Sequence, residues 1–513
     1  MRRFLPGFLA LFVLTGCGDG SDTVTAASPS ISPATVDRHC DEAVYPSQAW
    51  AACEQANFAR TGEAPRDAIQ NPDFLQQVLL RSQKNGMDLL SIYAKDPSQF
   101  QSLNTPFTPI SSSYFGPLVG DPYRYPDAPG PNGADFYANE AEVIPVTYYD
   151  RSCARITGRV WQPKFVPAGR QLPAVVIENG SVVGVEPLYW WAAQALVRAG
   201  YQVFTHDQRG QGRADFIAPD GRAGTNIEPE VFWLGAVDAI DFLRSRPSQP
   251  YPHNVSCAGT YPTPVTAFNP LHASLDRERL GLAGHSFGAA GVTWVQSYGA
   301  PGADPWPGLI DRENPVDVIV AWDALGRPDS PIAANASNYW VDGANYAGPL
   351  YSLAGKPYPA VVPRVPALDL PSEYGVLALP FTSPPDPEQH LKSFRVWQAA
   401  GVPVVAVTTA GTVHTESSPA PMIVATSWCP ASSRQVCEGG WGLPLLEHYT
   451  VAWFDRWLKQ PGEIGHDTAD ARLLDDAGPQ GAAKMSWHFH SARDFPARNG
   501  QRQRCDTIRA GCP

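Results

Sequence analysis

The pentapeptide Gly284-His285-Ser286-Phe287-Gly288 holds a serine between two glycines at Gly-x-Ser-x-Gly spacing. A serine hydroxyl is a weak nucleophile unless the backbone exposes it beside a base, and this spacing is typical of a tight turn from a strand into a helix. In such a turn, a side chain at either glycine would collide with neighbouring elements. An apolar run over 279–283 precedes the motif and small residues over 289–298 follow it. The pattern predicts that Ser286 is a nucleophile.

A serine nucleophile needs a histidine base, and in this arrangement an acid and then the histidine follow on loops after later strands. We expect His414 to be the base, because Gly411-Thr412-Val413-His414 directly follows the apolar run Val402–Thr408. The other histidines after a plausible acid lie in expected helices, in a late strand-like segment where a structural role is favoured, or outside such a loop: His390, His448, His466, His488 and His490.

The acid that orients the histidine has several candidates. Asp323 ends the expected strand Val316–Ala321, which is the first strand after the Ser286 turn. Asp369, Glu373 and Asp386 come after that strand, and the acid more often follows the next strand of this arrangement. We favour Asp323, and Glu373 is the alternative.

Backbone N–H groups must stabilise the oxyanion that forms when the serine attacks a carbonyl. The N–H of Phe287 is the first candidate, because it lies at the start of the helix that follows Ser286. The second donor is expected from Asn179-Gly180-Ser181, which follows a buried strand over 173–178, and we expect it to be the N–H of Ser181.

The glycine-rich turn Asp207-Gln208-Arg209-Gly210-Gln211-Gly212 resembles a phosphate-binding loop only superficially. Asp215 stands where a dinucleotide-binding loop has its third glycine, and the turn does not end in Gly-Lys-Ser/Thr. No Cys-x-x-Cys pair occurs in the chain, and no histidine stands at ligand spacing beside a cysteine. We therefore expect no cofactor and no metal.

Short apolar runs alternate with helical stretches from residue 142 onward, which favours a mostly parallel sheet covered by helices. The expected strands are 143–148, 155–161, 173–178, 201–206, 279–283, 316–321, 366–370 and 402–408. The expected helices are 71–94, 188–199, 228–244, 289–298, 387–400 and 441–459. Irregular insertions are expected at 247–276 and 324–362.

The N-terminal sequence is typical of an export signal. Arg2 and Arg3 precede an apolar run over 4–14 that is too short to span a bilayer, as in a signal peptide. Leu14-Thr15-Gly16-Cys17 resembles a bacterial lipobox, in which the cysteine is acylated and becomes the new N-terminus. We expect cleavage after residue 16, a lipid at Cys17 and a membrane-anchored envelope protein, with a freely secreted protein as the alternative.

Charge and cysteine content fit an exported globular protein. The formal charge is −12 and becomes about −14 when the signal peptide leaves, which disfavours nucleic acid as a partner. Eight cysteines remain besides Cys17, an even number that predicts four disulfides. Proximity in the chain favours the first three of the following pairs and leaves the fourth: Cys40–Cys53, Cys429–Cys437, Cys505–Cys512 and Cys153–Cys257.

The residues over roughly 142–475 resemble the α/β-hydrolase superfamily, and within it the branch of the platelet-activating factor acetylhydrolases and related lipases. The likeness lies in the pentapeptide at 284–288, Trp322-Asp323, Pro371-Ser372-Glu373-Tyr374 and Gly411-Thr412-Val413-His414. In that branch the acid follows the earlier strand, which supports Asp323. Asn179-Gly180 departs from the usual His-Gly, and the insertions have no counterpart, so substrate specificity does not transfer.

The sequence thus predicts an α/β-hydrolase fold and a serine hydrolase that cleaves carboxylic esters through Ser286, His414 and Asp323. Its substrate would be a small-molecule or lipid ester. The alternatives are a peptidase or amidase on the same fold and a non-catalytic envelope binding protein. The expected parts are a signal peptide (1–16), a flexible tether (17–37), an N-terminal extension packing on the core (38–140), the hydrolase domain (141–475) and a C-terminal tail with a disulfide (476–513).

Overall fold

The structure is a computed structural model that describes residues 43–61, single positions between 70 and 98, and most of the chain from 136 to 512. The signal peptide, the tether, Cys17, Cys40, Cys429 and Cys437 lie outside the described residues, as does most of the expected helix over 71–94. The residues that are not described are 1–42, 62–69, most of 71–93, 99–135, 182–183, 225–227, 324, 329–357, 376–379, 382, 419–441, 477–480 and 513.

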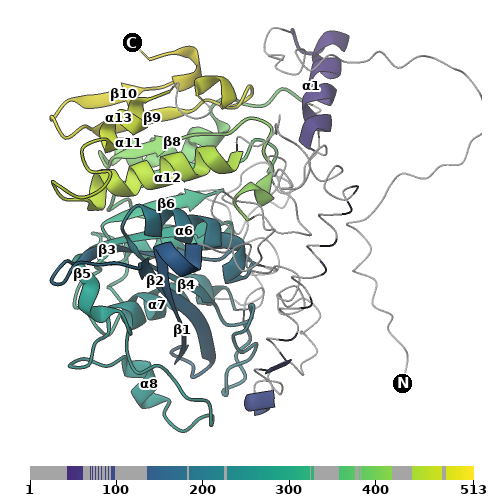
Figure 1. Cartoon of the computed structure of the whole chain (residues 1–513). Coiled ribbons are helices and arrows are strands. Elements are labelled where there is room, and N and C mark those ends of the chain that lie inside the picture. Colours follow the sequence, from purple (N-terminus) through teal and green to yellow (C-terminus); the bar gives the residue numbers. More distant parts are fainter. Residues whose placement is uncertain are drawn as a thin grey trace, which may run out of the picture. The chain divides into compact units, whose positions relative to one another are not determined.

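A ten-stranded sheet organises the chain from residue 141 onward, in the order β1-β2-β4-β3-β5-β6-β7-β8-β9-β10 (Figure 1). The strands are β1 (Ala141–Tyr149), β2 (Arg155–Pro163), β3 (Leu172–Glu178), β4 (Gln202–Asp207), β5 (Leu275–His285), β6 (Val318–Trp322), β7 (Ala367–Leu370), β8 (Val404–Ala406), β9 (Ala492–Pro496) and β10 (Arg502–Cys505).

The centre of the sheet is parallel and its two ends are antiparallel. Strands β4, β3, β5, β6, β7 and β8 pair in parallel, while β1, β2, β9 and β10 join their neighbours in antiparallel fashion. Parallel strands are buried on both faces, and every residue of β3 is accordingly buried. The order β1-β2-β4-β3-β5-β6-β7-β8, with β2 antiparallel, is that of the α/β-hydrolase fold, which confirms the predicted fold class.

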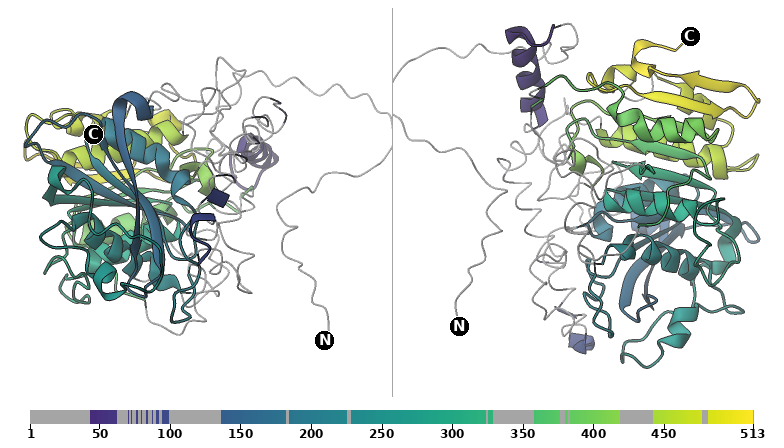
Figure 2. Two further views of the ribbon diagram at one scale, coloured as in Figure 1. Left: turned by 60° about the horizontal axis from the view of Figure 1, so that its bottom comes forward. Right: turned by 180° about the vertical axis from the view of Figure 1, so that it is seen from behind.

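Helices cover both faces of the sheet (Figures 1 and 2). Helices α6 and α12 pack with the apolar cluster on one face, and α7, α9 and α11 pack with the cluster on the other. The helices are α1 (Gln48–Thr61), α6 (Trp190–Arg198), α7 (Leu234–Arg244), α8 (Pro252–Ser256), α9 (Phe287–Ser297), α11 (Lys392–Ala399), α12 (Gly442–Leu458) and α13 (Ala469–Leu474).

Three expectations about the elements differ from the structure. The segment with His488 and His490 is not a strand, and the strand expected over 402–408 keeps only three residues as β8. Residues 476–513, expected as a tail, contribute β9 and β10, and β9 pairs with β8. The sequence pattern was ambiguous here because the short β9 joins the sheet through a partner about ninety residues earlier in the chain.

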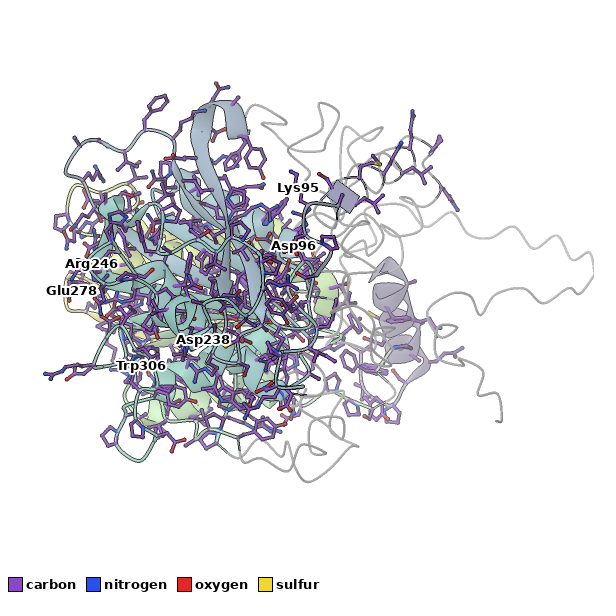
Figure 3. The ribbon with its side chains drawn as sticks, turned by 90° about the horizontal axis from the view of Figure 1, so that it is seen from below. Lys95, Asp96, Asp238, Arg246, Glu278 and Trp306 are labelled. Carbon is purple, nitrogen blue, oxygen red and sulfur yellow. A yellow bond between two sulfur atoms is a disulfide. The ribbon has the colours of Figure 1, made fainter. Side chains whose placement is uncertain are left out.

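Segments before residue 100 contact the core at several described positions. His488 Nε2 lies 2.7 Å from Glu54 Oε2 of α1, and both side chains are buried. Asp96, labelled in Figure 3, lies 3.3 Å from the guanidinium of Arg155, the first residue of β2. Most of residues 38–140 lie outside the described residues, so the N-terminal extension that packs on the core stays a prediction.

Two predicted disulfides are confirmed, Cys153–Cys257 and Cys505–Cys512. Cys53 is also disulfide-bonded, while the expected pair of Cys429 with Cys437 stays a prediction. Among the helices of the described part of the chain, none combines the length and the apolar character needed to cross a bilayer.

Candidate active site

Ser286 occupies a strained turn between β5 and α9. Its backbone angles are φ 58° and ψ −122°, a conformation that L-residues rarely adopt. A Cβ on Gly284 would lie 2.3 Å from the carbonyl oxygen of Gly288, and a Cβ on Gly288 would lie 2.5 Å from the carbonyl oxygens of Glu178 and Asn179. Only glycine fits at both positions, as the sequence predicted from the spacing.

The Ser286 turn is tied to the neighbouring strand. The N–H of Ser286 donates to the carbonyl of Trp322, the last residue of β6, over 2.9 Å. The next residue is Asp323, whose φ of 49° is also positive. Both residues therefore leave the carboxyl edge of the parallel sheet side by side in strained conformations, which is where α/β proteins place their ligands.

Asp323 and His414 are in direct contact. The Nδ1 atom of His414 lies 2.6 Å from Oδ2 of Asp323, and Ser372 donates its hydroxyl to the same oxygen over 2.7 Å and its N–H to Oδ1 over 2.9 Å. Burial alone would raise the pKa of Asp323, but the hydrogen bond and charge of His414 and the bonds from Ser372 outweigh it and lower the pKa to about 2. Asp323 is therefore a carboxylate at neutral pH.

His414 lies next to the Ser286 turn. Its ring centroid is 4.5 Å from that of His285, the residue before Ser286, and its carbonyl oxygen is 2.9 Å from His285 Nε2. Because Nδ1 faces Asp323, the tautomer with hydrogen on Nδ1 leaves Nε2 with a lone pair that can accept a proton. The structure thus brings together the three chain segments that the sequence singled out.

Glu373, the alternative acid, makes other contacts. Its Oε2 accepts the N–H of Gly411 over 2.6 Å, and its Oε1 accepts the N–H of Trp487 over 3.0 Å and the hydroxyl of Ser486 over 2.5 Å. The Glu373 carboxylate therefore braces the loop that leads to His414 against the segment before β9.

The two remaining acid candidates have local roles in the structure. Asp369 is buried in β7 and accepts the N–H of Leu325 over 2.9 Å. Burial first, and then the charge of Asp323, raise the pKa of Asp369 to about 8, so this side chain is protonated at neutral pH. Asp386 accepts the N–H of Glu388 over 3.0 Å at the surface.

The other candidate histidines bond to groups outside this cluster. One ring nitrogen of each histidine lies within hydrogen-bond or ion-pair distance of a group other than Asp323 and Ser286. The pairs are His390 with Thr408, His448 with the carbonyl of Arg472, His466 with Asp467, His488 with Glu54 and His490 with Glu388. For His488 and His490 this agrees with the expected structural role.

The expected oxyanion donors flank Ser286. Phe287 begins α9, directly after Ser286. A Cβ on Gly180 would lie 3.1 Å from Cβ of Ser286, so the Asn179-Gly180-Ser181 loop passes against Ser286 at its glycine. A side chain at position 180 would therefore crowd the Ser286 turn, and the role of the Ser181 N–H stays a prediction.

The sequence did not single out several polar residues that support this cluster. Ser372 supplies two hydrogen bonds to Asp323. Tyr189 and Gln211 bond to Gly180, and the ring of His285 bonds to the carbonyl of His414. His285 stood inside the motif, and Ser372 stood beside the alternative acid. Tyr189 carried no sequence signal, and Gln211 stood only within a glycine-rich turn, because both reach the site only through the fold.

Two cavities flank the polar groups of the core. One lies beside Asp323 and His414 and is lined also by Ser372, Thr412 and Leu446. A second contains none of the predicted site residues and is lined by the ion pairs Arg151–Asp238 and Arg209–Asp150. Asp238, labelled in Figure 3, is fully buried in that ion pair, which is a structural arrangement.

Within the described ranges no group of three or more His, Cys, Asp or Glu side chains is placed to hold a metal ion. The described site offers side chains and backbone amides for chemistry. Its elements are a strained serine, a histidine bound to a carboxylate, and a loop that passes against the serine.

Comparisons with known proteins return only structures. No protein-family model matches the chain, and a search of the curated proteins gives no match. Among solved structures, the chain is similar to a variant of the AtxE2 isopeptidase with astexin3-dC4 bound, at 15% identity and a TM-score of 0.34, over 67% of this chain and 45% of that one. It thus spans less than half of that protein.

Two esterase structures are also similar. One is from a study of two fungal esterases from Rhizomucor miehei, at 15% identity and a TM-score of 0.37, over 66% of this chain and 87% of that one. The other is a hyperthermophilic esterase from the archaeon Pyrobaculum calidifontis, at 19% identity and a TM-score of 0.32, over 60% and 84%. At these identities and scores, the likeness carries no statement about substrate.

Proposed function

We propose that this protein is a serine hydrolase that cleaves carboxylic esters, with Ser286 as nucleophile, His414 as general base and Asp323 as the orienting acid. The observation that carries the proposal is the 2.6 Å contact between His414 Nδ1 and the buried Asp323 carboxylate, next to a serine in a strained turn. A histidine held by a carboxylate beside such a serine is the arrangement that nucleophilic acyl transfer needs.

The reaction runs in two steps. His414 takes the hydroxyl proton as Ser286 attacks the ester carbonyl, and the imidazolium that forms is stabilised by the charge of Asp323. Collapse of the tetrahedral intermediate breaks the ester bond, and the proton passes from His414 to the departing alcohol. Water, activated by the same histidine, then releases the acid and restores Ser286.

Backbone amides carry the negative charge of the intermediate. The N–H of Phe287 starts α9, so the positive end of the helix dipole adds to its hydrogen bond. The N–H of Ser181 is the second donor in this proposal, supported by the close approach of Gly180 to Ser286. Loss of one such donor costs roughly 10²- to 10³-fold in kcat.

The test is ester turnover and active-site labelling. Wild type and Ser286→Ala are compared for hydrolysis of short p-nitrophenyl esters and for labelling by a fluorophosphonate. We expect both signals to vanish in the variant while its thermal unfolding is unchanged. Equal labelling or equal turnover in the two proteins would overturn the nucleophile assignment. A wild type faster on the matching p-nitroanilides than on the esters would move the protein to the amidase class.

We further propose that the protein is exported and held at a membrane of the cell envelope by a lipid on Cys17. The support is the sequence Leu14-Thr15-Gly16-Cys17 behind a short apolar run. Two disulfides in the core agree with an oxidising compartment. The substrate in this proposal is a small-molecule or lipid ester that reaches the envelope.

A further inference from the structure

The turn over 207–212, which the sequence left without a function, reaches the candidate active site through Gln211. This residue is fully buried, and its Nε2 donates to the carbonyl oxygen of Gly180 over 2.5 Å. Gly180 is the residue that passes against Ser286. A buried amide thus holds the loop that carries the second proposed oxyanion donor.

The orientation of the Gln211 amide is itself determined. The side-chain amide of Asn179, also fully buried, donates to Oε1 of Gln211 over 3.3 Å and to the carbonyl of His206 over 2.7 Å. Because Oε1 receives a hydrogen from Asn179, the donor end of Gln211 must face Gly180. The asparagine that replaces the usual histidine of this loop therefore fixes the glutamine.

The hydrogen bond to the Gly180 carbonyl also sets the direction of the Ser181 N–H. The carbonyl of Gly180 and the N–H of Ser181 belong to one peptide group, and in a trans peptide the two bonds point in opposite directions. A hydrogen bond that pulls the carbonyl toward Gln211 therefore turns the Ser181 N–H away from it. Without such a bond this peptide would have more freedom to rotate, because glycine has the widest range of backbone angles.

A second hydrogen-bond chain holds the other side of Gly180. The N–H of Gly180 donates to the Tyr189 hydroxyl over 2.9 Å, that hydroxyl lies 2.9 Å from Nδ1 of His285, and Nε2 of His285 lies 2.9 Å from the carbonyl of His414. A carbonyl only accepts, so Nε2 of His285 carries a hydrogen. Burial, with the charge of His414, lowers the pKa of His285 to about 3, so the ring is neutral and its Nδ1 accepts the Tyr189 hydrogen.

We propose that Gln211 is a positioning residue that orients the Ser181 N–H toward the oxyanion, with Tyr189 holding the opposite side of the same loop. This inference rests on the proposed function. Gln211 touches no substrate, and it acts by fixing one peptide plane. Its loss should leave substrate binding in place and remove stabilisation that exists only in the transition state.

The test compares Gln211→Leu with Gln208→Leu. Both variants remove a buried amide from the same turn, but the amide of Gln208 donates to the carboxylate of Glu178, whereas that of Gln211 donates to Gly180. Rates are normalised to sites titrated with a fluorophosphonate, so that unfolded protein does not count. We expect kcat on p-nitrophenyl butyrate to fall roughly 10- to 100-fold in Gln211→Leu with KM within about twofold, because a misdirected N–H loses most of its stabilisation of the oxyanion. Gln208→Leu should stay within about threefold of wild type.

A trifluoromethyl ketone, which forms an oxyanion on the serine, separates positioning from a general loss of structure. Its Ki should rise in Gln211→Leu by the same factor as kcat/KM falls, as expected for a transition-state analogue. Tyr189→Phe, which removes a single hydroxyl, should move Ki and kcat/KM together by a smaller factor. If Gln211→Leu does not fold, Tyr189→Phe provides the same comparison of Ki with kcat/KM.

The outcomes separate this inference from the proposed function. If Ser286→Ala turns over ester like wild type, the proposed function falls and this inference falls with it. If Ser286→Ala is inactive while Gln211→Leu or Tyr189→Phe keeps wild-type kcat and Ki, only the inference on positioning is overturned. An equal fall of kcat in Gln208→Leu and Gln211→Leu would also overturn it, because the effect would then be one of the whole turn.

Discussion

Replacing Asp323 with asparagine changes one atom that contacts His414 and tests how the acid acts. Oδ1 of Asp323 accepts the N–H of Ser372, so the asparagine oxygen must stay at that position and its NH₂ must take the place of Oδ2. That NH₂ then faces His414 Nδ1 as a donor, so Nδ1 has to accept and the hydrogen moves to Nε2. In this tautomer His414 cannot accept the proton of Ser286.

The size of the effect follows from this tautomer change. An acid-to-amide exchange in a Ser-His-Asp triad lowers kcat by about 10⁴, or about 5 kcal/mol in the barrier, and we expect that loss here at neutral pH. The variant should also be less stable. The pKa of Asp323 falls from 3.8 to about 2, so folding favours its ionised form by about 2 kcal/mol. That stabilisation is complete above about pH 4 and is lost as the pH falls through about 2.

The assay is p-nitrophenyl ester turnover per titrated site at pH 7, with thermal unfolding followed in parallel. Glu373→Gln is the matched control, because it also alters a buried carboxylate near His414 but one that bonds to Gly411, Trp487 and Ser486. The control should lose stability by about 1–3 kcal/mol and keep most of its kcat. If Asp323→Asn kept a tenth or more of the wild-type kcat, or if Glu373→Gln lost as much, the assignment of the acid would be refuted.

Three further predictions concern stability and location. Asp369→Asn mimics the protonated carboxyl of Asp369, whose pKa of about 8 in the folded protein makes the wild type lose stability as the pH rises from about 4 to 8. The variant should therefore have a higher Tm than wild type at pH 8 and a smaller difference in Tm at pH 5. An equal difference in Tm at both pH values would contradict this. Replacing both Cys153 and Cys257 with serine opens a loop of 104 residues, and by chain entropy it should lower the free energy of unfolding by about 5 kcal/mol. Loss of the C-terminal bridge, with its separation of 7 residues, should lower it by about 2 kcal/mol, and denaturant unfolding measures both. Cys17→Ser should move the protein from the membrane to the soluble fraction and remove the added lipid mass, whereas an unchanged mass would exclude the anchor.

Local sequence patterns were sufficient for the elements closest to the nucleophile. The two glycines of the motif are required by contacts within a few ångströms of Ser286, and the apolar runs at β3, β5 and β6 are long enough to mark buried strands. The order of serine, aspartate and histidine along the chain follows from the direction of parallel strands, whose carboxyl ends meet at one edge. These features depend on neighbours in the chain, and a single sequence contains them.

The tertiary structure decided what depends on contacts between distant segments. Asp323 and Glu373 both follow strands at the same edge of the sheet, and only the packing directs one carboxylate to His414 and the other to Gly411. The pairing of β9 with β8 likewise joins segments about ninety residues apart.

The support of the oxyanion loop also came from the fold alone. Gln211 stands in a turn whose glycines were its only sequence signal, and Tyr189 stands before an ordinary helix, yet both bond to Gly180. The physical reason is that a buried polar group is satisfied by whatever partner the fold brings near it, and sequence spacing does not specify that partner. Local sequence patterns therefore identified the residues that we propose as reactive, whereas the groups that hold them in position became visible only in the tertiary structure.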